Sequence, residues 1–230
     1  MPKLFDNLKE NKIIKFIINK IRYISNSLSK NLIQNPTYDY NIHKFLISHE
    51  DPIRYATIAL AITKIIKKKI NGSFAEIGVY KGHASKIIHS IAPYKTLYLF
   101  DTFEGFPLKF LKTEDKRFQD TNETVLKKTI GDLENIVIKK GIFPETTKGL
   151  ENEKFSFVLI DLDLYEPTLA ALEFFYSRIN PGGYIFIHDY NNPHESERGV
   201  YKAVNKFFIG KLEKIIELPD KWGSALIRKI

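Results

Sequence analysis

Acidic side chains follow two apolar runs that have the character of buried strands. Asp161 and Asp163 come directly after one run, and His188 and Asp189 follow the next. Side chains two positions apart face the same side of a strand, so Asp161 and Asp163 share a side if the first strand extends that far. Because the carboxyl ends of parallel strands meet at one edge of a sheet, all four groups are expected to converge on one crevice.

These four residues predict a divalent metal site. No Lys or Arg adjoins the acids in the sequence, so carboxylates that meet would repel one another unless a hard cation neutralised them. Asp161, Asp189 and His188 are the candidate ligands, with Mg²⁺ favoured by oxygen donors and Mn²⁺ as the alternative because of the imidazole. Such a metal lowers the pKa of a bound hydroxyl, and Asp163 or His188 is the candidate base.

Each of these residues also has a structural interpretation. Asp163 precedes a predicted helix and Asp189 precedes a turn, and acidic side chains frequently cap such segments. His188 is a ligand, a general base, or a partner that orients a carboxylate. The residues alone leave these alternatives open.

A glycine-containing turn follows the first predicted strand. Glu76, Gly78 and Gly82 form an E-x-G-x-x-x-G pattern, whose glycines let the backbone approach a ligand at the start of the next helix. The pattern is not the G-x-G-x-x-G of dinucleotide sites, and its acid suits a cationic or hydroxyl-bearing ligand. Asp101 ends the second predicted strand, where Rossmann-type folds place a carboxylate that accepts the two ribose hydroxyls.

Alternating strands and helices must position these residues. Short apolar runs alternate with helical stretches, which predicts a parallel sheet covered on both faces. The expected strands are 74–79, 96–100, 136–139, 155–161 and 184–187, and the intervening helices begin near Gly82, Asn122 and Glu166. Two late strands, 212–217 and 224–228, are expected to pair antiparallel. A further helix is expected over 51–70, with proline at its first position.

The N-terminal region carries the whole net charge. Residues 1–70 hold 13 Lys and Arg against five Asp and Glu, so their net charge of +8 equals that of the chain. Over 4–34, Ile and Leu recur at spacings of three and four between basic residues, which predicts a basic amphipathic helix. We expect a basic helical extension over 1–50 and one catalytic domain over 51–230.

The extension has several candidate partners. Its helix packs on the domain or on a second copy in a homo-oligomer, or it contacts an anionic membrane surface or nucleic acid. Nucleic acid is disfavoured, because the catalytic part contributes nothing to the basic charge.

Composition excludes other classes of protein. The chain has no cysteine, which excludes disulfides, thiolate metal sites and cysteine nucleophiles. No apolar stretch reaches the roughly 20 residues that a membrane span needs, and the start lacks the features of a secretory signal. We therefore expect a cytoplasmic globular protein.

Four motifs, in order, resemble the macrocin O-methyltransferase family of metal-dependent sugar methyltransferases. They lie within 50–230, at 75–82, 99–107, 160–168, and 181–183 followed by 188–190. The resemblance implies a Rossmann-like class I methyltransferase fold: an α/β domain with a mostly parallel seven-stranded sheet and helices on both faces. The implied S-adenosylmethionine site consists of Glu76, Gly78, Tyr80, Gly82, Ser85, Asp101 and Thr102. The implied Mg²⁺ site uses Asp161 and Asp189, and the family often has a second acid where this chain has His188.

The resemblance also implies methyl transfer to a hydroxyl of a sugar or glycan precursor. A small metabolite that is not a sugar is the alternative acceptor, and a Rossmann-type nucleotide-binding protein without methyl transfer is the alternative class. The segment 102–119 resembles a mobile stretch that lines the substrate site of the family. Its phenylalanines form either an apolar lid or ordinary core, namely Phe103, Phe106, Phe110 and Phe118.

Overall fold

The computed structural model describes residues 49–111, 113, 115–192 and 198–230, and before them residues 16, 17, 20, 21, 24, 45 and 46. Most of the predicted helix over 4–34 therefore lies outside the described residues, and the boundary between extension and domain stays a prediction. In the part of the chain that the structure describes, no helix is long and apolar enough to cross a membrane.

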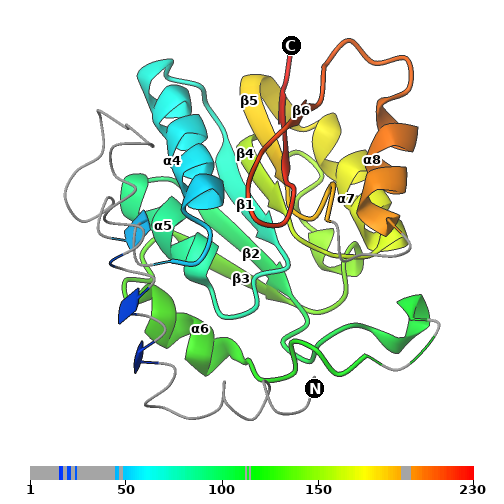
Figure 1. Cartoon of the computed structure of the whole chain (residues 1–230). Helices are drawn as coiled ribbons and strands as arrows, with labels where there is room; N and C mark the ends of the chain where they lie inside the picture. The colour runs from blue at the N-terminus through cyan, green and yellow to red at the C-terminus, as the bar shows by residue number, and fades with distance from the viewer. Residues whose placement is uncertain are drawn as a thin grey trace.

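A seven-stranded sheet forms the centre of the molecule, in the order β3-β2-β1-β4-β5-β7-β6 (Figure 1). Its strands are β1 (Ser73–Ile77), β2 (Leu97–Asp101), β3 (Ile136–Lys140), β4 (Phe155–Ile160), β5 (Ile179–Ile187), β6 (Ile216–Glu217) and β7 (Ala225–Arg228). β1 to β5 pair in parallel, whereas β7 pairs antiparallel to β5 and to β6. The mostly parallel sheet and the antiparallel terminal pair are confirmed.

Two strands differ from the prediction by more than one residue in length. β5 begins at Ile179 rather than Tyr184, because Ile179 already pairs with Phe155 of β4. β6 spans only two residues of the expected 212–217, and both are exposed.

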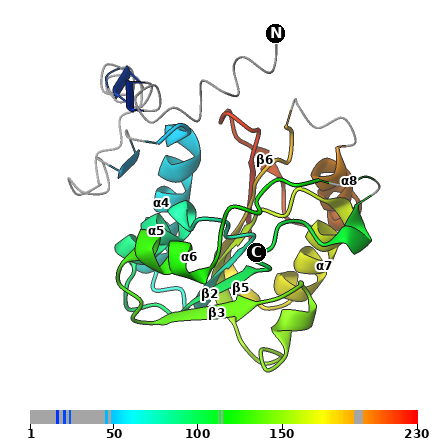
Figure 2. The same ribbon diagram turned by 90° about the horizontal axis from the view of Figure 1, so that it is seen from below.

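Helices cover both faces of the sheet, as predicted (Figures 1 and 2). α4 (Pro52–Lys67), α5 (His83–Ile91) and α6 (Glu123–Ile130) lie on one face, and α7 (Tyr165–Tyr176) and α8 (Gly199–Phe208) on the other. α8 was missed by the sequence prediction, although Val200, Ala203 and Val204 recur at helical spacing and are buried.

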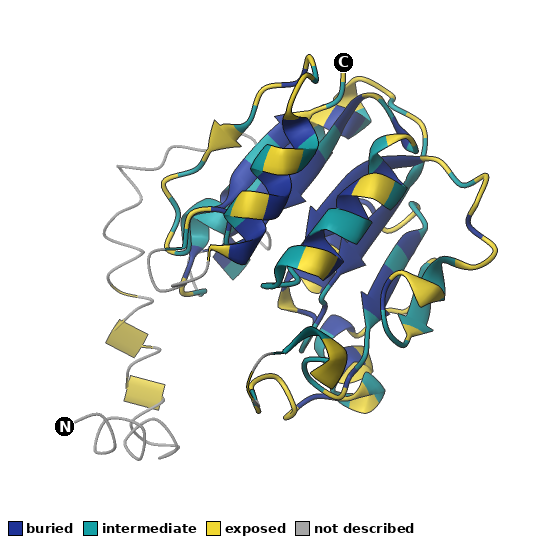
Figure 3. Ribbon diagram, turned by 90° about the vertical axis from the view of Figure 1, so that its right-hand side faces the viewer, coloured by how far each residue is buried: buried dark blue, intermediate teal, exposed yellow. Residues whose placement is uncertain are grey.

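The strands separate two hydrophobic cores, because successive side chains point to opposite faces. Phe74, Phe157 and Leu159 pack beneath α4 to α6, whereas Ala75 and Val158 pack toward α7 and α8. Figure 3 shows the buried strands between helices whose outer faces are exposed. A parallel sheet buried on both faces leaves only its carboxyl edge for a ligand site.

Candidate active site

The glycine turn after β1 packs directly on the end of β4. Gly78 has a φ of +85°, and a Cβ there would lie 1.8 Å from the carbonyl oxygen of Asp161. Gly82 also has a left-handed backbone and precedes α5. Glycine is therefore required at position 78 both for its conformation and for the close approach.

Glu76 and Ser85 of the expected donor site meet in the structure. Glu76 is 2% exposed, and Ser85 Oγ donates a hydrogen bond of 2.6 Å to its Oε2 atom. Burial raises the pKa of Glu76 to about 8. The turn thus carries a carboxyl group that is largely protonated at neutral pH.

Asp101 holds the same turn in place. Its Oδ2 atom accepts hydrogen bonds from the backbone N–H groups of Val79, at 2.7 Å, and Tyr80, at 2.8 Å. Its Oδ1 atom accepts one of 2.6 Å from the backbone of Phe103. The sequence predicted a ribose anchor at Asp101, and the structure adds this second role of fixing the turn.

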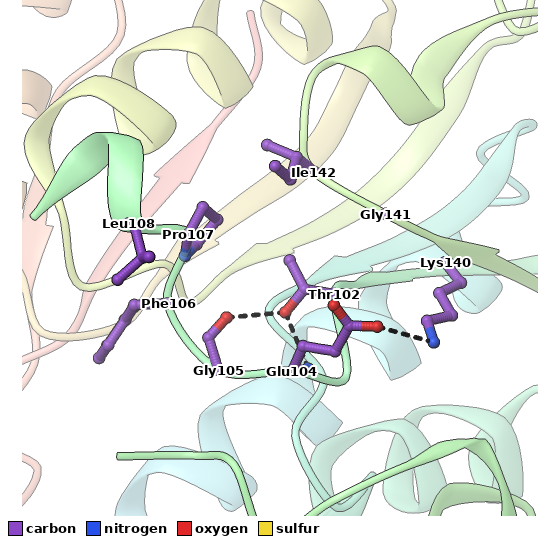
Figure 4. Close-up of a pocket in the computed structure, with 9 residues that line it drawn as sticks. All are labelled: Thr102, Glu104, Gly105, Phe106, Pro107, Leu108, Lys140, Gly141 and Ile142. Carbon is purple, nitrogen blue, oxygen red and sulfur yellow. Dashed lines mark hydrogen bonds and ion pairs between the residues drawn. The ribbon is translucent and has the colours of Figure 1, made fainter. Parts of the chain in front are cut away.

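A cavity of about 280 Å³ is lined by residues that follow the ends of β2 and β3, among them Thr102, Gly141 and Ile142 (Figure 4). Its wall is formed on one side by 102–108, in which Thr102 Oγ1 donates to the carbonyl of Gly105 over 2.8 Å. The residues 140–142 after β3 form the other side, and Lys140 pairs with Glu104 at 3.1 Å. Of the predicted donor-site residues, Thr102 lines this cavity.

The expected metal ligands come together at the ends of β4 and β5. Asp161, His188 and Asp189 each offer one ligand atom, and these atoms lie within 4.8 Å of one another. His188 Nδ1 is 2.9 Å from Asp161 Oδ1 and 3.2 Å from Asp189 Oδ2. Two carboxylates and one imidazole are a donor set that divalent metals take, so the residues present fit such an ion.

Asp163 also lies close to Asp161 and Asp189, but its position does not result from strand geometry. The shared side for Asp161 and Asp163 was expected only if the strand extended that far, and β4 ends at Ile160, so strand alternation does not place Asp163. Instead Asp163 has a left-handed backbone with φ +58°, a conformation that aspartate tolerates better than most residues. Burial, and then the charges of Asp161 and Asp189, raise the pKa of Asp163 well above its usual range.

The capping interpretation of Asp163 is not realised. Among the described residues, no side-chain hydrogen bond caps the start of α7, which Leu164 precedes.

Arg54 is the site residue that the sequence did not reveal. Its Nη2 atom donates a hydrogen bond of 2.7 Å to Asp161 Oδ2 from the first turn of α4. The expectation that no cationic side chain accompanies these acids is therefore wrong, because residues 107 positions apart in the chain become neighbours only in the fold. The chain offers a partial signal: a single arginine within a helix that is otherwise uncharged until its last turn.

The two cations determine the charge state of the cluster. Burial raises the pKa of Asp161, but the charges of His188 and Arg54 outweigh it and hold that pKa below its usual range. Burial lowers the pKa of His188, yet the neighbouring Asp161 raises it to about 9. The ligand-free cluster therefore contains an ionised Asp161 and a protonated His188.

The phenylalanines of the segment 102–119 lie partly in the hydrophobic core and partly in an aromatic cluster next to the acidic residues. Phe103 is 4% exposed and belongs to the core, whereas the Phe118 ring packs edge-on against Tyr80 at 5.1 Å and Phe106 at 5.3 Å. The guanidinium of Arg117 lies over the rings of Phe106 and Phe118, and its Nη1 atom is 4.0 Å from Asp163 Oδ2. An aromatic wall with one cation thus borders the acidic cluster.

Comparison with known proteins identifies a family and relatives that this chain is similar to. The family model of macrocin O-methyltransferase (TylF) matches residues 52–218. The 8-demethyl-8-(2,3-dimethoxy-alpha-L-rhamnosyl)-tetracenomycin-C 4'-O-methyltransferase of Streptomyces olivaceus is 23% identical over 156 residues. That alignment covers 60% of this chain and 60% of the relative's own length.

Solved structures share the fold. The O-methyltransferase NovP superposes with a TM-score of 0.64 at 18% identity, over 76% of this chain and 78% of that protein. The apo structure of CalS11, a TDP-rhamnose 3'-O-methyltransferase, superposes with a TM-score of 0.58 at 19% identity, over 91% and 93%. Since the family model spans most of the described domain, the chain belongs to the macrocin O-methyltransferase family.

Proposed function

We propose that this protein is an S-adenosylmethionine-dependent O-methyltransferase that methylates a hydroxyl of a sugar or glycan precursor with the help of a divalent metal. The observation that carries the proposal is the contact between the glycine turn and the acidic cluster, because Gly78 lies against the carbonyl of Asp161. A donor bound on the turn therefore lies next to the groups that would activate an acceptor.

The donor site is the turn together with the cavity beside β2 and β3. Glu76 and Asp101 offer acceptors for the hydroxyl and amino groups of the donor, and the cavity lined by Thr102 and Ile142 would enclose its adenine ring. The donor supplies the methyl group as an electrophilic sulfonium.

The acidic cluster would hold the metal and the acceptor. Asp161, His188 and Asp189 would bind the ion, which would lower the pKa of the acceptor hydroxyl. Asp163 is the better candidate base, because its raised pKa makes its carboxylate a stronger base, whereas His188 would give its Nδ1 lone pair to the ion. Asp163 would take the hydroxyl proton as the acceptor oxygen receives the methyl group, and the donor would leave as S-adenosylhomocysteine.

The choice of acceptor class follows two relatives whose names refer to rhamnose, the tetracenomycin rhamnosyl 4'-O-methyltransferase and the TDP-rhamnose 3'-O-methyltransferase. The aromatic wall of Tyr80, Phe106 and Phe118 agrees with it, because sugar rings pack their C–H faces on aromatic side chains. We place the activity in the cytoplasm, where S-adenosylmethionine and activated sugars are made. Attachment of the basic extension to a second subunit or to a membrane stays a prediction.

Methyl transfer tests the function directly. The full chain is incubated with methyl-labelled S-adenosylmethionine, Mg²⁺ or Mn²⁺, and panels of nucleotide sugars, glycosides and non-sugar phenols. We expect label in a sugar hydroxyl, and we expect Asp163→Asn to lower kcat by about 10²-fold or more while S-adenosylhomocysteine binds unchanged. Glu166→Gln, beside the cluster in sequence but on the exposed side of α7, is the matched control and should keep full activity.

Two results would contradict the proposal. Transfer to phenols alone would replace the acceptor class, and binding of S-adenosylhomocysteine without transfer to any panel member would leave a nucleotide-binding protein.

A further inference from the structure

Asp161 and Asp189, the two carboxylates among the candidate metal ligands, are each held at one oxygen by a neighbouring side chain. Arg54 Nη2 donates to Asp161 Oδ2 at 2.7 Å, and Asn192 Nδ2 donates to Asp189 Oδ1 at 3.0 Å. The other oxygens, Asp161 Oδ1 and Asp189 Oδ2, are those that face His188 Nδ1. Each carboxylate therefore presents a single oxygen to the centre.

The imidazole presents a single nitrogen to the same centre. His188 is 7% exposed, and its Nδ1 atom faces the carboxylates, whereas Nε2 is buried without a hydrogen-bond partner among the described residues. Because no described residue bonds to Nε2, the described contact that orients the ring is the one at Nδ1.

A site with these three donor atoms discriminates among divalent ions. Mg²⁺ prefers a shell of oxygen atoms, and Ca²⁺ takes six to eight oxygens, frequently from bidentate carboxylates. Transition metals such as Mn²⁺ accept imidazole nitrogen together with carboxylate oxygen. Residues that orient the ligands contribute to such selectivity as much as the ligands do.

We propose that Arg54 and Asn192 act as positioning residues that leave each carboxylate one free oxygen, and that these oxygens with His188 Nδ1 form a site that selects Mn²⁺ over Mg²⁺ and Ca²⁺. The inference rests on the proposed metal site and adds the identity of the ion and two residues that control it. Neither Arg54 nor Asn192 touches the ion.

The first experiment measures the metal–nitrogen contact and does not depend on activity. Mn²⁺ bound to the full chain is examined by electron spin echo spectroscopy, with and without ¹⁵N-labelled histidine. We expect modulation from one coordinated histidine nitrogen, and its loss in His188→Asp, which still binds Mn²⁺ through oxygen. Bound Mn²⁺ without nitrogen modulation in the wild-type chain, or no bound Mn²⁺ at millimolar concentration, overturns the inference.

Calorimetric titration measures how strongly the site prefers Mn²⁺ to Mg²⁺. The ratio of the Mg²⁺ and Mn²⁺ dissociation constants should fall by about tenfold or more in both His188→Asp and His188→Asn. The two variants differ in charge but both replace nitrogen by oxygen, so a ratio that changes only in His188→Asp means that charge rather than donor type is responsible. Unchanged binding of S-adenosylhomocysteine shows that each variant is folded.

A pair of Arg54 variants tests the positioning role. Arg54→Met removes both the charge and the donor, whereas Arg54→Lys keeps a charge and an N–H donor on a side chain that is only slightly shorter. We expect Ca²⁺ binding to strengthen relative to Mn²⁺ in Arg54→Met and in Asn192→Ala, and to stay near the wild-type ratio in Arg54→Lys. Equal ratios in the two Arg54 variants would show that Arg54 does not position Asp161.

These outcomes are separate from the proposed function. An enzyme that methylates sugars but binds Mg²⁺ and Mn²⁺ equally refutes only the selectivity. A chain that binds Mn²⁺ through nitrogen but methylates no acceptor refutes only the function.

Discussion

At the residue scale, Glu76 is ionisable but almost completely enclosed. Its side chain accepts a hydrogen bond from the Ser85 hydroxyl, and the negative charges of Asp161 and Asp101 disfavour its ionisation further. The ligand-free protein therefore avoids a charge at this position, which a cationic donor would stabilise.

Glu76 should make the stability of the ligand-free protein depend on pH. In the unfolded chain the group ionises near its usual pKa of 4.5, whereas in the folded protein its pKa is about 8. The folded state thus holds its proton longer, so the free energy of unfolding falls as pH rises from about 4.5 to about 8, then levels. Glu76→Gln removes this loss, and its melting temperature should exceed that of the wild type increasingly between pH 5.5 and pH 8.

Glu134 is exposed, so Glu134→Gln is the control for this measurement. Its melting temperature should equal that of the wild type at every pH in the range. A constant difference between Glu76→Gln and the wild type across the range would show that the carboxyl does not titrate there.

Residue types also account for what the sequence could predict. Asp161, His188 and Asp189 follow buried strands directly, so the sheet edge alone brings them together. Arg54 could not be found in this way, because its partner is distant in the chain and no periodicity reports such a contact. The hydrogen bonds of Asp101 were missed for a related reason: they depend on the backbone directions of the turn, which side-chain types do not specify.

At the scale of elements, the glycine turn and the end of β4 form one unit. Gly78 and Gly149 both have a φ of +85°, but a Cβ on Gly149 would meet nothing within 4 Å. The two positions thus differ in contact and not in conformation.

Gly78→Ala should therefore cost much more than Gly149→Ala. Both substitutions impose a left-handed conformation on alanine, at about 1–2 kcal/mol. Only the first also displaces the Asp161 backbone, so it should further weaken S-adenosylhomocysteine binding and metal binding together. Chemical denaturation measures the loss of stability, and calorimetry measures the loss of binding. Equal losses in the two variants would contradict the importance of the contact between Gly78 and the Asp161 backbone.

Elements with continuous patterns were predicted well, and those with short ones were not. The helices that follow β1 and β4 begin where proline, glycine and apolar spacing indicate. α8 is as regular but follows a polar stretch of sequence, and β6 has only two paired residues, so local sequence gave each a weak signal.

At the scale of the molecule, Asp51 connects the start of α4 to the C-terminal hairpin. Its Oδ1 atom accepts from the backbone of Arg54 at 3.2 Å, and its Oδ2 atom accepts from the backbone of Lys221 at 3.1 Å. The helix that carries Arg54 is thereby fixed against the loop between β6 and β7.

Asp51→Ala should lower activity as well as stability. Loss of the cap costs about 1 kcal/mol, and release of α4 from the hairpin lets Arg54 leave Asp161. Asn122→Ala is the matched control, because Asn122 caps α6 by accepting from the backbone of Val125 at 3.0 Å, away from the acidic cluster. We expect similar losses in denaturation but a lower kcat only in Asp51→Ala; equal kcat values would show that α4 keeps its place without the hairpin.

The antiparallel strand β7 has a consequence for synthesis of the protein. Ile187, just before His188 and Asp189, pairs with Ala225, and Lys221 holds the helix of Arg54. During synthesis these residues leave the ribosome after the donor turn does. The contacts that fix Ile187 and the helix of Arg54 can therefore form only once the chain has been made as far as its last strand.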